Sequence, residues 1–227
     1  MINKLKGTLI VSCQALPDEP LYGADVMAKM AKACVLGGAS AIRANSVSDI
    51  KAIREVVDVP IIGLIKQDYP DSEVYITPTK KEVMELIESG CEIIAIDATN
   101  RKRPNDEKLE DLLQLIKTHN KIALADISTY EEGINAEALG FDLVSTTLSG
   151  YTKYSKKLIG PDVKLVKRLV KKLNIGVIAE GRIMNERDLK RVIKAKPFAI
   201  VIGSAITRPL LITKNYVNTL NNHKKYL

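Results

Sequence analysis

The stretch NIGVIAEGRIMNERDLKRVIKAKPFAIVIGSAIT, residues 174–207, contains the pattern that decides the fold of this 227-residue chain. A short apolar run (174–182) is followed by a helical pattern (185–196) and then by a second apolar run (197–207). Short runs that are apolar throughout are typical of parallel strands buried on both faces, and such strands need a crossover helix between them. The stretch therefore predicts a strand–helix–strand unit.

The same unit recurs along the chain. The apolar runs lie at residues 7–14, 39–45, 59–67, 91–99, 121–128, 141–150, 174–182 and 197–207, and the helical patterns at 24–38, 46–57, 77–90, 107–120, 129–140, 161–173, 185–196 and 209–222. Eight such units predict an α/β fold, a single-domain TIM (β/α)8 barrel over residues 1–227. The competing doubly wound open sheet would need fewer strands and would carry a glycine-rich fingerprint after the first strand, which this sequence lacks.

Composition supports a packed core and limits the partners. Hydrophobic residues make up 46% of the chain but aromatic residues only 4%, so Ile, Leu, Val and Ala must build the core. The net charge of +7 is compatible with nucleic acid, a membrane surface or an anionic metabolite as a partner. The dense basic clusters are short, at 101–103, 153–157 and 223–227, and are not interleaved with aromatic residues. We therefore expect a mostly solvated charged surface, a small anionic ligand and no nucleic acid.

The cysteines and the N-terminal segment bear on the cellular compartment of the protein. Cys13, Cys34 and Cys91 show no metal-ligand spacing and the chain has only two histidines, so the sequence contains no recognisable metal-binding pattern. We expect the cysteines to pack in the core. The apolar run near the N-terminus is too short for a membrane span and is interpreted as a first strand. These features predict a cytoplasmic protein without a membrane partner.

Polar residues stand where the apolar runs stop. In a TIM barrel these positions converge on the active site at the carboxyl ends of the strands. A simpler reading is that loops are polar wherever strands end, but so many ionisable groups at one mouth favour a site. In chain order the residues are Gln14, Arg43, Lys66, Asp97, Asp126, Thr147, Glu180 and the pair Gly203–Ser204.

The last two units carry a phosphate-binding pattern. The segments 180–182 and 203–209 follow the seventh and eighth runs, where many barrels bind phosphate. The small residues Gly181, Gly203 and Ser204 would let backbone N–H groups approach phosphate oxygens, and Arg182 and Arg208 could add charge-assisted hydrogen bonds.

Lys66 and Glu180 end the third and seventh runs, so they face each other across an eight-strand barrel. Two opposed proton-transfer groups suit a reaction that inverts a carbon centre. A partly dry mouth and a nearby positive Arg43 would lower the pKa of Lys66 and make it a general base. Structural alternatives stay open: Lys66 could pair with Asp97 or Asp126, and Glu180 could pair with Arg182 or Arg208.

The other strand-end residues are equally open to two interpretations. Arg43 either pairs with an acid of the mouth or holds the substrate, and Asp97 and Asp126 either serve the site or cap the following helices. Gln14 could bind a sugar hydroxyl or only its own loop. Ser46 or Ser48 is expected to cap the second helix, and Gly90 to end the third.

Ten short segments occur in a characteristic order: SCQAL (12–16), AIRAN (41–45), IIGLIK (61–66), YITPT (75–79), AIDAT (95–99), RKRP (101–104), ADIST (125–129), DLVSTTLSGYT (142–152), IAEGRI (178–183) and GSAITRP (203–209). Together these segments resemble the bacterial N-acetylmannosamine-6-phosphate 2-epimerase family over roughly residues 7–220.

The resemblance implies a TIM barrel of the ribulose-phosphate-binding type that interconverts N-acetylmannosamine 6-phosphate and N-acetylglucosamine 6-phosphate in sialic acid catabolism. It implies a homodimer and no metal or nucleotide cofactor. Lys66 and Glu180 fall on the family's catalytic positions; Gln14, Arg43, Asp126 and Arg208 fall on other pocket positions. Two alternatives remain: a Schiff-base lyase or aldolase acting on a phosphosugar through Lys66, and a non-enzymatic, RNA-linked phosphate sensor.

Overall fold

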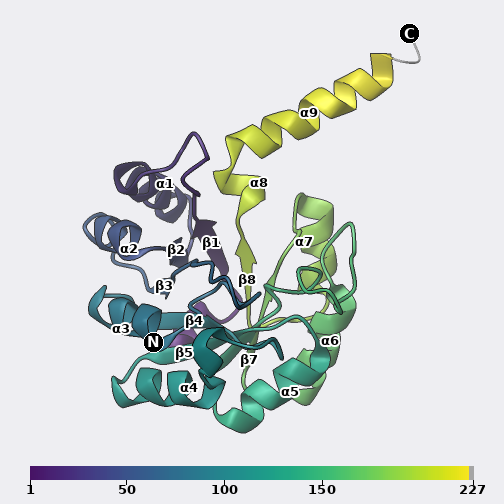
Figure 1. Cartoon of the computed structure of the whole chain (residues 1–227). Helices are drawn as coiled ribbons and strands as arrows, with labels where there is room; N and C mark the ends of the chain where they lie inside the picture. Colours follow the sequence, from purple (N-terminus) through teal and green to yellow (C-terminus); the bar gives the residue numbers. More distant parts are fainter. Residues whose placement is uncertain (225–227) are drawn as a thin grey trace.

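Eight parallel strands close into one barrel in the order of the chain, as the repeat predicts (Figure 1). The structure, a computed structural model, describes residues 1–224, so the end of the basic cluster at 223–227 lies outside the described residues. The strands are β1 (Leu9–Cys13), β2 (Ala41–Asn45), β3 (Ile61–Leu64), β4 (Ile93–Asp97), β5 (Ile122–Asp126), β6 (Leu143–Ser145), β7 (Gly176–Glu180) and β8 (Ala199–Ile202). The TIM barrel prediction is confirmed.

Helices follow the strands on the outside of the barrel. They are α1 (Ala24–Leu36), α2 (Val47–Arg54), α3 (Lys80–Glu88), α4 (Leu109–Thr118), α5 (Tyr130–Leu139), α6 (Val163–Lys172), α7 (Glu186–Ile193), α8 (Ser204–Thr207) and α9 (Pro209–Lys224), with short 3-10 turns η1 (Ile2–Leu5) and η2 (Pro104–Asp106). No helix among them has the length and hydropathy that a membrane span requires.

Alternation along each strand divides the core into two layers. In β2, Ala41 belongs to the cluster inside the barrel, whereas Ile42 and Ala44 pack outward against the helices. Leu5 of η1 is fully buried in the interior cluster and closes the amino-terminal end of the barrel. Apolar side chains therefore fill the amino-terminal part of the barrel interior, and polar side chains can gather only at the carboxyl-terminal mouth.

Local signals define several helix ends. The Ser46 hydroxyl accepts the backbone N–H of Asp49 at 3.2 Å, so Ser46, not Ser48, caps α2. The third helix is shorter than the predicted 77–90, because Thr79 caps it and Thr77 has a positive φ of 47°. Gly90 follows this helix with a φ of 92°, a conformation that favours glycine.

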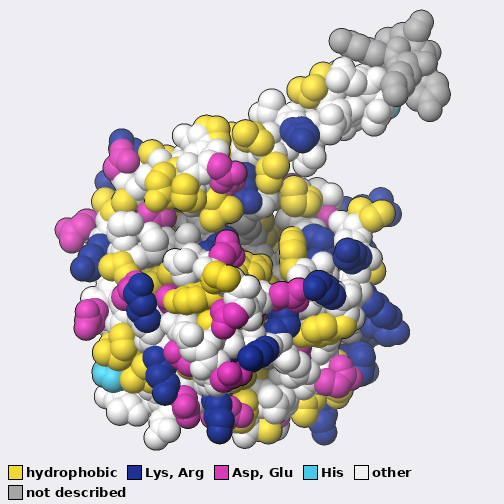
Figure 2. Space-filling model, in the orientation of Figure 1, with side chains coloured by type: hydrophobic (Ala, Val, Ile, Leu, Met, Phe, Trp, Pro, Cys, Tyr) yellow, Lys and Arg dark blue, Asp and Glu magenta, His cyan; other side chains and the backbone are white. Residues whose placement is uncertain are grey.

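The last helix departs from the usual barrel arrangement. After the short α8, α9 extends away from the barrel, and Figures 1 and 2 show it projecting from the rounded body. Residues 213–223 are exposed. The outward side chains of Leu9 on β1 and Ile200 on β8 are only partly buried, whereas Ile42 and Ile94 on other strands are fully buried. The outer face of β1 and β8 is therefore less covered at Leu9 and Ile200, whereas Val11, Cys13 and Ile202 further along these strands are buried.

Candidate active site

A cavity of about 250 Å³ opens at the carboxyl-terminal mouth of the barrel. Residues from β1, β2, β3, β6, β7 and β8 or from the loops after them line it, as expected for this fold. Ten of the eleven residues predicted for the site are among them: Gln14, Arg43, Lys66, Thr147, Glu180, Gly181, Arg182, Gly203, Ser204 and Arg208. Asp126 is the exception.

Asp126 lies beneath the cavity, fully buried, and holds Arg43. Its two carboxylate oxygens accept the two terminal nitrogens of Arg43 at 3.0 and 2.5 Å. This two-pronged geometry matches the guanidinium fork to the carboxylate. Of the interpretations open for Arg43, the structure shows the pairing with acids of the mouth, and Asp126 is placed to act through Arg43 rather than at the cavity surface.

Arg43 also reaches Glu180. Its Nη1 donates to Glu180 Oε2 at 3.0 Å, so one buried cation lies between two carboxylates. Burial by itself lowers the pKa of Arg43, but the charges of Asp126 and Glu180 outweigh burial and hold the pKa above its usual value. Arg43 is therefore a permanent positive charge in the floor of the site.

The two oxygens of the Glu180 carboxylate differ in their hydrogen bonds. Oε2 accepts from Arg43 Nη1, from the Ser145 hydroxyl at 3.2 Å and from Thr147 Oγ1 at 3.0 Å. None of the residues in the described part of the chain donates to Oε1. Burial raises the pKa of Glu180, and Arg43 opposes this rise. The expected alternatives, pairing with Arg182 or Arg208, are not what the structure shows.

Lys66 follows the end of β3. The strand stops at Leu64, three residues before the end of the apolar run at 67, and the backbone N–H of Lys66 donates to the Asn45 side chain at 2.8 Å instead of joining the sheet. Its ammonium group forms no ion pair with any residue from 1 to 224. The two candidate structural partners are occupied elsewhere, since Asp97 pairs with Arg101 and Asp126 pairs with Arg43.

The environment disfavours the charged form of Lys66. Burial lowers the pKa of Lys66 to about 8, with further lowering from Arg208 and Arg43 and partial opposition from Glu180 and Glu19. At pH 7 such an amine is neutral in about a tenth of molecules, against about one in 3,000 for a lysine with an ordinary pKa. The sequence predicted that burial and a nearby positive Arg43 would lower the pKa of Lys66, and both causes operate in the structure.

The loops after β7 and β8 form an open backbone cradle. Gly181 has a φ of 108°. Gly203 lies immediately before α8 and close to Ser12, so a Cβ on Gly203 would lie 3.2 Å from the Ser12 Cβ. Arg208 lines the cavity and pairs with Glu19 at 2.9 Å. Small residues, backbone N–H groups and a cation fit a phosphate.

Arg182 and Gln14 are partly engaged by the protein itself. Arg182 donates from Nη1 to the Ser149 carbonyl and from Nε to the Gly160 carbonyl at 3.0 Å, so it ties down the loop after β6. Gln14 Nε2 donates to Ser12 Oγ at 2.8 Å, while its Oε1 is buried without a partner in the described residues. That free acceptor is suited to a hydroxyl of a bound sugar.

Several lining residues were not predicted. They are Ser12, Leu64, Tyr75, Ile76, Tyr151, Ile183, Met184, Val201, Ile202 and Thr207. Strand alternation could have indicated Ser12, two positions before Gln14. No local pattern could have indicated Tyr75, because a loop folds back to bring it to the mouth.

Comparison of the sequence with known proteins identifies its family. A family model described as "Putative N-acetylmannosamine-6-phosphate epimerase" matches residues 27–222. The chain belongs to this epimerase family. Relatives named "Putative N-acetylmannosamine-6-phosphate 2-epimerase" from Clostridioides difficile strain 630 and Clostridium perfringens strain 13 are each 55% identical over 220 residues, which cover 97% of this chain and 99% and 100% of theirs.

The solved structure of N-acetylmannosamine-6-phosphate 2-epimerase from Clostridium perfringens matches this epimerase-family chain with a TM-score of 0.95 at 54% identity, covering 96% of both chains. A thiamine phosphate pyrophosphorylase from Pyrococcus furiosus matches with a TM-score of 0.62 at 20% identity, which shows the shared barrel fold alone.

Proposed function

We propose that this protein interconverts N-acetylmannosamine 6-phosphate and N-acetylglucosamine 6-phosphate in sialic acid catabolism. The supporting observation is one cavity that contains a lysine with no ion pair in the described part of the chain, a carboxylate on the opposite side of the barrel and a phosphate-type cradle. The reaction exchanges a proton at one carbon without oxidation or reduction, so its chemistry calls for no redox cofactor.

Lys66 acts as the general base in its neutral form. The sugar ring first opens, which places C2 next to an aldehyde and makes the C2 proton acidic. Lys66 takes this proton, and the electron pair moves toward the C1 oxygen to form an enolate. Arg43, paired with Asp126 and Glu180, holds the Glu180 carboxylate in place.

Glu180 acts on the other face of C2. Its held oxygen fixes the orientation of the carboxylate, and its free Oε1 can carry a proton or orient the group that returns one. A variant in which Lys66 and a substrate hydroxyl move the proton between them fits the same geometry. Gly181, Gly203, Ser204 and Arg208 hold the phosphate, and Gln14 Oε1 accepts a sugar hydroxyl.

An NMR assay with N-acetylmannosamine 6-phosphate in D₂O tests the function directly. We expect N-acetylglucosamine 6-phosphate as the product, deuterium at C2 only, and full activity after exhaustive dialysis against a chelator. Absence of C2 exchange from a folded protein would refute the proposal.

The pH dependence follows from Lys66. Because its pKa lies near 8 and the neutral amine is the active form, kcat/KM should rise with pH and level off above about 8. The check is kcat/KM for the epimerisation measured from pH 6 to pH 10. A profile that stays flat from pH 7 to pH 9 would contradict a lysine base.

A homodimer and a cytoplasmic location belong to the same proposal. A sugar phosphate is charged and does not cross membranes unaided, which favours a cytoplasmic enzyme. Leu210, Tyr216, Val217 and Leu220 are exposed at helical spacing on α9, while the outer face of β1 and β8 is incompletely covered. A second copy that receives α9 on this face would bury both surfaces.

Sedimentation equilibrium at micromolar concentration should give twice the 25.0 kDa of one chain. Val217→Asp, which places a charge on the exposed stripe of α9, should shift the protein toward the single-chain mass, whereas Asn218→Asp should not. A wild-type protein that sediments as a monomer would contradict this arrangement.

A further inference from the structure

A loop folds back over the end of β3 and forms the cavity wall next to Lys66. Lys66 pairs with Ile76 in an isolated antiparallel bridge, Gln67 N donates to the Tyr75 carbonyl at 3.0 Å, and Thr77 N donates to the Ile65 carbonyl at 2.7 Å. This pairing brings Tyr75, nine residues further along the chain, to the cavity that Lys66 also lines.

The Tyr75 hydroxyl is a free, neutral donor. The ring packs against the cluster inside the barrel and lines the cavity, and no residue among 1–224 forms a hydrogen bond with the hydroxyl. Burial raises the pKa of Tyr75 to about 12, and the charges of Asp126 and Asp97 contribute to the rise. The phenol therefore keeps its proton throughout the range in which Lys66 titrates.

Three other polar side chains around the cavity, Arg43, Gln14 and Thr147, are engaged by the protein itself. The terminal nitrogens of Arg43 are bonded to Asp126 and Glu180. Gln14 Nε2 donates to Ser12, and Thr147 Oγ1 lies between carboxylate oxygens. These groups would have to break protein contacts to bind a new oxygen, whereas the Tyr75 hydroxyl would not.

The other cavity hydroxyls that donate to no described residue lie away from the loop that carries Lys66: Ser12 is on β1, Tyr151 follows β6 and Ser204 follows β8. Ser12 packs against Gly203 in the cradle assigned to the phosphate, which is attached to C6. Tyr75 lies instead on the loop that carries Lys66, the base that acts at C2. Because C1 is bonded to C2, we expect the C1 oxygen to be the substrate atom that the Tyr75 hydroxyl reaches.

We propose that the Tyr75 hydroxyl donates a hydrogen bond to the C1 oxygen of the substrate and stabilises the enolate. The inference rests on the proposed epimerisation. Lys66 takes the C2 proton, the C2–H electron pair becomes the C1–C2 double bond, and the carbonyl π electrons move onto the C1 oxygen. Tyr75 keeps its proton throughout, and the electrons return when C2 is reprotonated. The hydrogen bond strengthens as negative charge develops.

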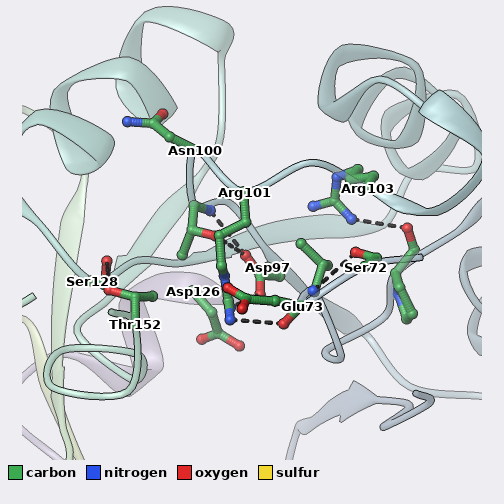
Figure 3. Close-up of polar contacts among 12 residues, drawn as sticks. Ser72, Glu73, Asp97, Asn100, Arg101, Arg103, Asp126, Ser128 and Thr152 are labelled. Atoms are coloured by element: carbon green, nitrogen blue, oxygen red, sulfur yellow. Dashed lines mark hydrogen bonds and ion pairs between the residues drawn. The ribbon is translucent and has the colours of Figure 1, made fainter. Parts of the chain in front are cut away.

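Arg101 is a positioning residue for this hydroxyl. It donates from Nη2 to the buried Asp97 at 2.5 Å, from Nε to Thr99 at 3.0 Å and from Nη1 to the Glu73 carbonyl at 2.7 Å (Figure 3). Its guanidinium also lies 5.9 Å from the centre of the Tyr75 ring. Arg101 thereby fastens the segment just before Tyr75 to β4.

Tyr75→Phe tests the proposal, since it removes only the hydroxyl. We expect kcat to fall by about 100-fold, at the lower end of what the loss of one oxyanion donor costs, with KM changed less than about 3-fold. C2 exchange in D₂O should fall by the same factor as epimerisation. The matched control is Tyr69→Phe on the same loop, whose hydroxyl bonds Glu82 and does not line the cavity; its kcat should equal the wild-type value.

A kcat for Tyr75→Phe within about twofold of wild type would overturn the proposal. Wild-type protein that neither epimerises nor exchanges at C2 would instead refute the proposed function, so the two failures are distinguishable. A double-mutant cycle tests Arg101: Arg101→Lys should slow the wild type but have little further effect on Tyr75→Phe. Equal effects in both backgrounds would show that Arg101 does not act through Tyr75.

Discussion

Replacing Lys66 with methionine is expected to lower kcat for epimerisation by about 1,000-fold, within the usual range for loss of a general base. Methionine keeps the volume of the side chain but cannot take a proton. C2 exchange in D₂O should fall by the same factor, because deprotonation starts both processes. Parallel NMR measurements of epimerisation and exchange check the prediction.

Lys51→Met, on the exposed side of α2, is the matched control and should leave both rates unchanged. Exchange at the wild-type rate in Lys66→Met would show that another group is the base. Borohydride treatment with substrate separates the proton-transfer role from an imine role, since a covalent adduct on Lys66 would support the lyase or aldolase alternative.

Replacing Arg43 with methionine is expected to lower the free energy of unfolding by about 3–5 kcal/mol, as expected when one partner of a buried ion pair is removed. The arginine is 1% exposed, and without it Asp126 and Glu180 would remain buried close together with no cation between them. Urea unfolding at pH 8 measures the loss. Arg54→Met, which breaks a partly exposed pair with Glu92, should cost only about 1 kcal/mol.

The stability deficit of Arg43→Met should shrink as the pH falls. Burial already raises the pKa of Glu180, and removal of Arg43 removes the main opposing charge. An acid whose folded pKa lies above its unfolded pKa costs stability when ionised, and the cost disappears once the pH is below both values. The difference in unfolding free energy between Arg43→Met and the wild type should therefore be smaller at pH 5 than at pH 8. A difference that stays constant with pH would contradict this account.

Much of the site could be predicted because a barrel maps sequence order onto space. The end of each apolar run marks a position at the mouth, so Lys66 and Glu180 could be assigned to opposite sides without coordinates. The pairing of Arg43 could not be chosen in advance, since several acids end neighbouring strands. Only the packed structure shows the guanidinium fork fitted to Asp126, with Asp126 below the cavity surface.

Tyr75 and α9 show where prediction from local pattern stops. Tyr75 reaches the cavity through backbone bonds between residues 65–67 and 75–77, and loop pairing of this kind leaves no periodic signal. The segment 209–222 does have a helical pattern, but the pattern says nothing about the direction in which α9 leaves the barrel. That direction is set by the non-helical backbone of Arg208 between α8 and α9, with a φ of −121° and a ψ of 78°.

By itself, the sequence determined the repeated strand–helix units, the barrel that they close and the strand-end groups at its mouth, because hydrophobic periodicity and chain order are local properties. The tertiary structure alone decided which charges pair, which donors stay free and how deeply each side chain is buried. Those outcomes depend on distances and burial between residues far apart in the chain. The lowered pKa of Lys66 illustrates the division: its place follows from the sequence, but its readiness to accept a proton comes from its packed surroundings.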